Sequence, residues 1–326
     1  MPLQDDVNES ADEWYALEGG TYPAVPRADS ADVILVRGLL PLPFADTPAF
    51  RAQQDVAEAA LLILSQSPHA RALAQAAVDN QYAIRIDNIV HDSGRVESHA
   101  HTDHLNRRIY AVPEADPVVL ALRIAHELAH VAQAQKGFEF SVMDQTPHAS
   151  IRELMALEGD ARAHEFIVAL ELAYKSGDEP APRLLFPQAI DAVMETLGSE
   201  MSKKLVAHFR PQFPDIDRDD MMARVFKSFY AALPLRAHYE ASVLHALQSV
   251  DAVHAADPAR FRNEFNAAAT LQKLGGYAAK SAKYLDLDSP QMAGVTAPTR
   301  AQLAAWQQMR DDAALQKPTH RKAPSP

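Results

Sequence analysis

The sequence predicts a mainly α-helical protein of the α+β class, with a small antiparallel sheet ahead of one long helix and a helical region after it. Alanine supplies much of the 48% hydrophobic content, whereas the chain has only 11 glycines. Because alanine has the highest intrinsic helix propensity and glycine one of the lowest, this composition favours helices. One run of short alternating segments interrupts the helical pattern and predicts the sheet.

The composition also excludes several classes of protein. The formal net charge of −12 would repel nucleic acid phosphates and anionic membrane surfaces, so we expect neither as a partner. The chain contains no cysteine, which excludes disulfides, thiolate metal ligands and cysteine nucleophiles. Any metal site must therefore be built from histidine, aspartate and glutamate.

The signals of export and membrane insertion are missing from the sequence. Residues 1–14 are acidic and lack the basic and apolar regions of a secretory signal. No stretch of about 18 residues is continuously apolar, as a membrane-spanning helix would require. We therefore expect a soluble cytoplasmic protein, with a leaderless export route left open. The oligomeric state is unknown at this stage.

Four segments are expected along the chain. Residues 1–30 are acidic and contain several glycines and prolines, which predicts a poorly ordered start. Residues 31–175 form the expected core, and residues 176–288 a helical region packed on it. Residues 289–326 contain many prolines and one short alanine-rich patch near 299–315 that predicts a helix, and we expect this segment to be a flexible tail.

Within the core, the expected elements follow from the local pattern. Residues 48–79 are rich in alanine and leucine, which predicts one or two helices. Turn-forming residues at 92–94 and 103–106 then separate short, partly alternating segments that predict an antiparallel meander. These segments are residues 82–87, 95–99 and 107–112. From Asp116 to about residue 285 the pattern is almost entirely helical.

The first helix after the sheet has well-marked ends. Asp116 can cap the first backbone amides, and Pro117 suits the first helical position. Gly137 suits the left-handed residue that follows a last helical turn. The helix therefore spans roughly residues 117–136, and the sequence His126-Glu127-Leu128-Ala129-His130 lies in its interior.

This H-E-x-x-H motif has the spacing of a metal site. Residues four apart lie on one helical face, so His126 and His130 can place two imidazole nitrogens on one ion. Glu127 lies about 100° around the helix from His126, beside the metal, where it can accept a proton from a metal-activated water. The alternative interpretation is an ordinary amphipathic helix with two incidental histidines. The apolar neighbours argue against it, since buried polar side chains are costly without a partner.

A third ligand has to come from elsewhere in the chain. A third histidine of the metzincin type is excluded, because Gln133 and Lys136 occupy the glycine and histidine positions of that pattern. Glu158 falls on the apolar side of the next helix, which makes it the best third ligand. Glu153 has capping-box spacing from a serine at position 150, and Asp160 could orient a ligating imidazole or face solvent. Both stay open as alternatives.

These two motifs resemble the glutamate-zincin group of metallopeptidases. The second motif, Glu158-Gly159-Asp160-Ala161-Arg162-Ala163, is similar to that of bacterial metallopeptidases of poorly defined function and of ImmA/IrrE-like peptidases. The resemblance implies a zincin-like core and one Zn²⁺ per chain, bound by His126, His130 and Glu158. It also implies that Glu127 is the general base and that the substrate is a peptide or protein. Arg162 stands where thermolysin-like enzymes have an aspartate, which places the chain outside that branch.

Several further residues are weaker candidates. His99, His101 and His104 cluster in the sheet region, where either metal binding or ordinary solvation is open. His238, Tyr239 or His245 could stabilise the oxyanion of a tetrahedral intermediate. Segment 107–112 is a candidate edge strand for pairing with an extended peptide, or an ordinary structural strand.

Two other classes of function were weighed. A di-iron bundle needs a second E-x-x-H motif, and no other glutamate in the chain has a histidine three residues later. The remaining alternative is a non-catalytic helical interaction or effector protein with a structural or decayed metal site. The intact Glu127 argues against it, because a structural site has no use for a general base.

Overall fold

The structure is a computed structural model whose described residues are mainly helical, with a three-stranded mixed sheet ahead of the helix that carries the motif. The predicted α+β class is therefore confirmed. The described residues are 38–39, 48–86, 100–114, 116–138, 142–175, 183–184, 189–190, 192–193, 199–212, 215–250, 253, 263–275 and 286–316. The expected acidic start, residues 1–30, lies outside them.

The chain divides into two compact units. Unit 1 combines residues 1–128 with 168–192, and unit 2 combines 129–167 with 193–326. Both limits fall inside a helix, at 128/129 in α5 (Pro117–Gln135) and at 167/168 in α6 (Pro147–Ala173). The four segments expected from the sequence remain a prediction.

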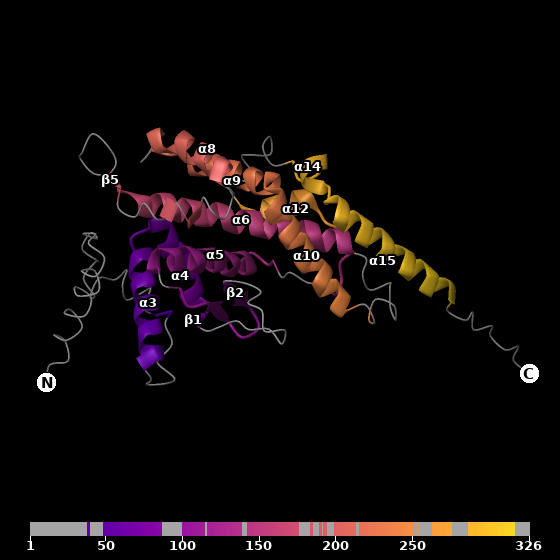
Figure 1. The fold of residues 1–326 in the computed structure, drawn as a ribbon, viewed down its shortest axis with the longest axis horizontal. Helices are drawn as coiled ribbons and strands as arrows, with labels where there is room; N and C mark the ends of the chain where they lie inside the picture. The colour runs from indigo at the N-terminus through magenta and orange to yellow at the C-terminus, as the bar shows by residue number, and fades with distance from the viewer. Residues whose placement is uncertain are drawn as a thin grey trace, which may run out of the picture. The chain divides into compact units, whose positions relative to one another are not determined.

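Unit 1 contains two helices within residues 48–79, where the sequence predicts one or two. They are α3 (Pro48–Leu64) and α4 (Pro68–Asp79), shown in indigo and purple in Figure 1. Ser67 caps α4, because its hydroxyl accepts a hydrogen bond from the backbone N–H of Ala70 at 3.0 Å. The same hydroxyl donates to Glu171 at 2.6 Å. A short two-stranded ribbon, β4 (Tyr174–Lys175) with β5 (Arg183–Leu184), completes the described elements of unit 1.

The sheet of unit 1 has strand order β1-β3-β2. Its strands are β1 (Ala83–Ile86), β2 (Ala100–Asp103) and β3 (Arg108–Ala111). The antiparallel β2–β3 hairpin matches the expectation, but β1 pairs with β3 in parallel, so the predicted all-antiparallel meander is wrong. A parallel pair cannot be joined by a tight hairpin turn, and the chain passes through β2 before it reaches β3. The predicted strand 95–99 lies outside the described residues, and β2 begins at Ala100.

The register of this sheet sorts its side chains onto two faces. Ile109 is paired with Ile84 on one side and with Thr102 on the other, and both isoleucines are buried. On the opposite face His101 stacks on Tyr110, with ring centroids 4.9 Å apart. Since successive residues of a strand point to opposite faces, Thr102 shares the buried face.

Both ends of helix α5 lie where the sequence predicts them. The Asp116 side chain accepts a hydrogen bond from the N–H of Val118 at 2.8 Å. At the other end Gly137 has a φ of 82°, and its N–H donates to the carbonyl of Ala134. The N–H of Phe138 donates to the carbonyl of Gln133. This pair of bonds is a Schellman motif, which fixes the last turn of the helix.

Unit 2 is built on the first part of α6. It also contains the part of α5 from Ala129 onward. Its other described elements are α8 (Ser199–Phe209), the 3₁₀ turn η1 (Arg210–Gln212), α9 (Arg218–Ala231), α10 (Leu233–Ser249), α12 (Ala267–Leu274), α14 (Pro290–Ala293) and α15 (Ala297–Gln316). A Cβ atom added to Gly159 of α6 would lie 3.1–3.2 Å from ring atoms of Phe226 and Phe229 of α9. The glycine therefore permits the close approach of α9 to α6.

The start of α6 differs from the expectation. The helix begins at Pro147, and the Thr146 hydroxyl accepts from the N–H of Ala149 at 3.3 Å. Ser150 is thus inside the first turn and fully buried, so the predicted capping box of Ser150 and Glu153 is wrong. The proline at the first helical position moves the start three residues upstream, and Glu153 accepts from the Gln145 amide instead.

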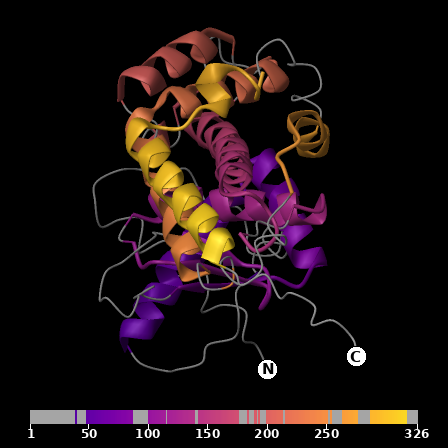
Figure 2. The same ribbon diagram turned by 90° about the vertical axis from the view of Figure 1, so that its right-hand side faces the viewer.

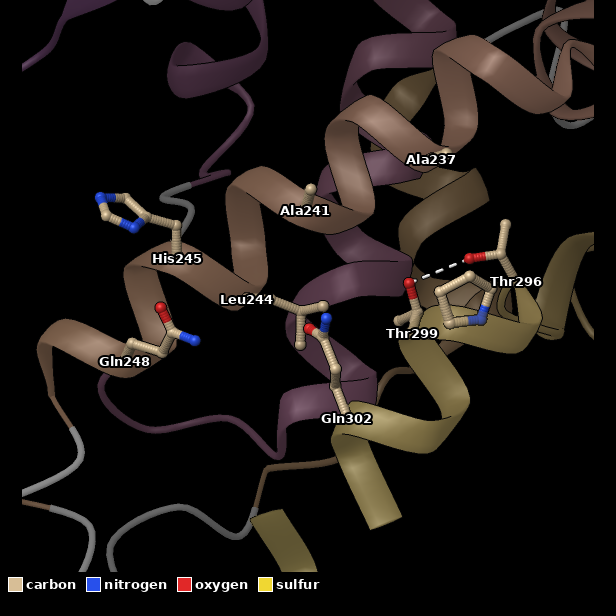
Figure 3. Close-up of a pocket in the computed structure, with 9 residues that line it drawn as sticks. Ala237, Ala241, Leu244, His245, Gln248, Thr296, Thr299 and Gln302 are labelled. Carbon is tan, nitrogen blue, oxygen red and sulfur yellow. Dashed lines mark hydrogen bonds between the residues drawn. The ribbon is translucent and has the colours of Figure 1, made fainter. Parts of the chain in front are cut away.

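Residues expected in a flexible tail form part of unit 2. Helix α15, yellow in Figures 1 and 2, starts beside α10. Thr296, the residue just before α15, forms hydrogen bonds with a side chain of α10. The buried Glu240 accepts from the N–H of Thr296 at 3.0 Å and from its hydroxyl at 2.6 Å. Arg236 donates to the same carboxylate at 3.0 Å. A shallow cavity of about 260 Å³ lies between the two helices, where Figure 3 shows the Thr296–Thr299 hydrogen bond.

In the part of the chain that the structure describes, no helix is long and apolar enough to cross a membrane.

The hydrogen bonds of the buried Glu240 to Arg236 and Thr296 should contribute to the stability of the fold. Replacing Glu240 by alanine leaves the buried Arg236 without its carboxylate, so the free energy of unfolding should fall by about 3–5 kcal/mol in urea denaturation. The double variant Arg236→Met, Glu240→Leu should lose much less, because no unpaired charge remains. An equal loss of unfolding free energy in the single and the double variant would contradict the view that the unpaired Arg236 charge causes the loss.

The same carboxylate should make stability depend on pH. Burial raises the pKa of Glu240, but hydrogen bonds from Thr296, Thr299 and Arg236 outweigh it and hold the pKa below its ordinary value of 4.5. A lowered pKa stabilises the fold above the unfolded-state value, and this contribution is lost as pH falls through the folded-state pKa. The stability gap between wild type and Glu240→Ala should therefore narrow in acid.

Candidate metal centre

The motif side chains of α5 lie together. His126, Glu127 and His130 each offer one ligand atom, and these atoms all lie within 4.8 Å of one another. His126 and Glu127 are only 6% and 4% exposed. Among the described residues, these three form the group of histidine, cysteine or carboxylate side chains that could hold a metal ion. The helix therefore carries its polar motif inside the protein rather than at the surface.

A strand of the sheet holds the Glu127 carboxylate. The hydroxyl of Thr102, in β2, donates to Oε2 of Glu127 at 2.7 Å and lies 3.1 Å from its backbone carbonyl oxygen. β2 lies at one edge of the described sheet and next to α5 (Figure 1). Thr102 was not among the residues singled out from the sequence. The alternation of the strand places it on the buried face, but its contact with Glu127 needs the tertiary structure.

In unit 2, His130 faces a carboxylate of α6. Its Nε2 atom lies 3.5 Å from Oε1 of Glu158. Glu158 is 8% exposed, so the sequence-based expectation that it lies on the buried side of its helix is confirmed. The other imidazole nitrogen of His130, Nδ1, lies 2.8 Å from the side-chain oxygen of Gln133.

Two further side chains surround Glu158. Tyr239 of α10 receives a hydrogen bond at 3.1 Å from Arg162, one helical turn after Glu158. Burial raises the pKa of Tyr239, and the charge of Glu158 and a hydrogen bond to it raise the pKa further. Arg162 also forms an ion pair with the buried Glu165. At neutral pH Tyr239 is therefore an un-ionised hydroxyl next to a carboxylate.

The alternative third ligands have other partners. The Glu153 carboxylate accepts from Gln145, and burial raises its pKa. Asp160 is fully buried, and its carboxylate accepts from the Gln133 amide at 2.7 Å. Of the three acidic residues considered from the sequence, Glu158 has a carboxylate oxygen 3.5 Å from Nε2 of a motif histidine, His130. Asp160 instead reaches His130 through Gln133.

The further candidates named from the sequence, the histidines of the sheet region and three residues of α10, have different surroundings in the structure. His101 stacks on Tyr110, and Nδ1 of His104 lies 2.8 Å from the Tyr82 hydroxyl; His99 lies outside the described residues. Of the α10 residues, Tyr239 lies beside Glu158, whereas the exposed His245 lines the cavity at α15 in Figure 3. His238 is also exposed.

Of the two interpretations of segment 107–112, the structure rules out the edge strand and supports an ordinary structural strand. β3, which spans most of residues 107–112, is the central strand of the described sheet, and β1 and β2 are its edges. The reason is that β1 pairs on the free side of β3 rather than following the order of the chain. A pairing edge near α5 would therefore be β2.

The donor set fits a divalent metal. Two imidazoles on one helical face, with a carboxylate 3.5 Å from one of them, are the ligand types that zinc and similar ions accept. Burying these groups without such a partner would be costly. The fold and the motif thus define a helical protein of the α+β class with a candidate metal-binding site of the H-E-x-x-H type.

The chain belongs to the Putative metallopeptidase family (DUF6782), whose model matches residues 38–275. This match includes the sheet, α5 and the whole of α6, and it extends through α12. Neither the curated proteins nor the solved structures compared with the chain gave a match. The family and the residue group together support a metal-dependent peptidase. The likeness to ImmA/IrrE-like peptidases stays a hypothesis.

Proposed function

We propose that this protein is a zinc-dependent metallopeptidase that hydrolyses peptide bonds. The observation that carries the proposal is the residue group on α5, in which one ligand atom each of His126, Glu127 and His130 lies within 4.8 Å of the others and the Thr102 hydroxyl donates to the Glu127 carboxylate. Two histidines alone would suit many kinds of metal site. The adjacent, oriented carboxylate is what a hydrolase requires.

In this proposal His126, His130 and Glu158 hold one zinc ion per chain. The support for Glu158 is its 3.5 Å distance from Nε2 of His130, together with its burial and its hydrogen bond to Tyr239. A bound zinc ion supplies Lewis-acid chemistry, because it lowers the pKa of a water ligand and polarises a peptide carbonyl. Tyr239 and Arg162 then serve to orient the carboxylate of Glu158.

Glu127 acts as the general base. Its carboxylate accepts a proton from the attacking water and returns the proton to the amine that leaves. Thr102 donates to one carboxylate oxygen, which fixes the plane of the group and leaves the other oxygen for the proton transfer. The substrate is a peptide or protein, and the net charge of −12 favours basic segments within it.

The alternative, a non-catalytic protein with a structural or decayed site, accounts less well for these contacts. A structural zinc site closes its coordination with protein ligands and needs no adjacent base. Here the residue next to the first histidine is a nearly inaccessible glutamate with a dedicated hydrogen-bond donor.

The metal content of the purified protein tests the ligands. Wild type should contain one zinc per chain, and both His130→Ala and Glu158→Ala should lose it, because each removes a ligand of a three-residue site. Glu153→Ala is the matched control and should keep the metal. Zinc retained in Glu158→Ala and lost in Glu153→Ala would move the third ligand to Glu153.

Turnover of a fluorogenic peptide library tests the general base. Glu127→Gln should retain zinc but lose activity by at least about 100-fold, the usual contribution of a general base. Because the change keeps size and removes only basicity, a Glu127→Gln variant as active as wild type would overturn the proposed mechanism.

Thr102 should affect catalysis without affecting metal binding. Thr102→Val removes one hydrogen bond to a charged group, worth about 1.5–3 kcal/mol, so kcat should fall by about 10- to 100-fold with KM unchanged. Thr102→Ser keeps the hydroxyl and should restore most of the activity. A change in KM alone would show that Thr102 contacts substrate rather than Glu127.

A further inference from the structure

A chain of hydrogen bonds runs from His130 into the interior of unit 2. Nδ1 of His130 lies 2.8 Å from Oε1 of Gln133, one helical turn later in α5. The amide nitrogen of Gln133 donates to Oδ2 of Asp160 at 2.7 Å and to the backbone carbonyl of Leu157 at 2.8 Å, both in α6. Gln133 is 2% exposed and Asp160 is fully buried, so bulk water has little access to these bonds.

The two acceptors in α6 determine which way the Gln133 amide faces. A backbone carbonyl oxygen can only accept a hydrogen bond, so the NH₂ group of Gln133 must face Leu157, and the same nitrogen donates to Oδ2 of Asp160. The amide oxygen is then turned toward His130. A flipped amide would place its oxygen against two other oxygens at hydrogen-bond distance, and it would lose both bonds.

The amide oxygen in turn determines the tautomer of His130. An amide oxygen only accepts, so Nδ1 of the neutral imidazole must carry the ring proton. Nε2 then has an unshared electron pair, and this is the atom that lies 3.5 Å from Glu158. The opposite tautomer would put the lone pair of Nδ1 against that of the Gln133 oxygen at 2.8 Å.

We propose that Gln133, anchored by Asp160 and the Leu157 carbonyl, is a positioning residue that selects the Nδ1–H tautomer of His130 and so keeps Nε2 free to bind a metal. The link to metal binding rests on the proposed function, whereas the tautomer itself does not. Residues that orient a ligating histidine change metal affinity by about 10- to 100-fold when they are lost.

The tautomer can be read in the metal-free protein by NMR. Protein with ¹⁵N-labelled histidine, kept at a pH at which the ring is neutral, gives distinct nitrogen signals for the two tautomers, and His130→Ala identifies the signal of His130. Wild type should show the Nδ1–H form. Gln133→Met should lose that preference and shift toward the Nε2–H form, which predominates in water.

A second variant controls for destabilisation of the fold by Gln133→Met. Gln133→Met leaves Asp160 short of a donor, so the double variant Gln133→Met, Asp160→Asn removes the buried charge as well and should show the same shift. Asp160→Asn alone is the matched control. It keeps the Leu157 acceptor and an oxygen at position 160 but replaces a charged acceptor by a neutral one, so the Nδ1–H preference of His130 should weaken less than in the two variants that lack Gln133.

Zinc affinity, measured by competition with a chromophoric chelator, completes the test. Both variants that lack Gln133 should bind zinc about 10- to 100-fold more weakly than wild type and Asp160→Asn. Wild-type protein in the Nε2–H form, or a tautomer that does not respond to Gln133→Met, would overturn the inference even if zinc binds. A wild type that shows the expected tautomer but binds no zinc would instead overturn the proposed function.

Discussion

The structure depends on satisfying the polar side chains that the motif places inside α5. A buried carboxylate or imidazole is costly unless it is paired, and breaking such a pair costs several kcal/mol. Glu127 is held by the Thr102 hydroxyl, and His130 lies beside Glu158 and Gln133. These contacts require β2 to pack against the first part of α5 and α6 to pack against its later turns.

The contact between Thr102 and Glu127 also constrains the register of the sheet. Thr102 can reach Glu127 only if β2 keeps its register against β3, because a shift by one residue would turn Thr102 away and present His101 instead. Ile84 and Ile109 share the buried face and hold the parallel β1–β3 pair in the core. The small mixed sheet thus serves to position one hydroxyl.

The acidic residues of α6 are not equivalent, although they lie close together in the sequence. Glu153 accepts from Gln145, Glu158 lies between His130 and Tyr239, and Asp160 accepts from Gln133. Their partners come from different parts of the chain, so each carboxylate has its own surroundings and can have a different role. We infer that Glu158 serves the metal, while Asp160 serves the orientation of a histidine through Gln133.

The sequence by itself determined the α+β class, the limits of α5 and the burial of Glu158, because capping residues and helical periodicity act over a few neighbouring residues. It did not determine the parallel pairing of β1, the start of α6 at Pro147 or the central place of β3. Thr102 and Gln133 were also missed as partners of Glu127 and His130. Only the tertiary structure decided these points, since strand order and hydrogen bonds between distant segments depend on which surfaces pack together.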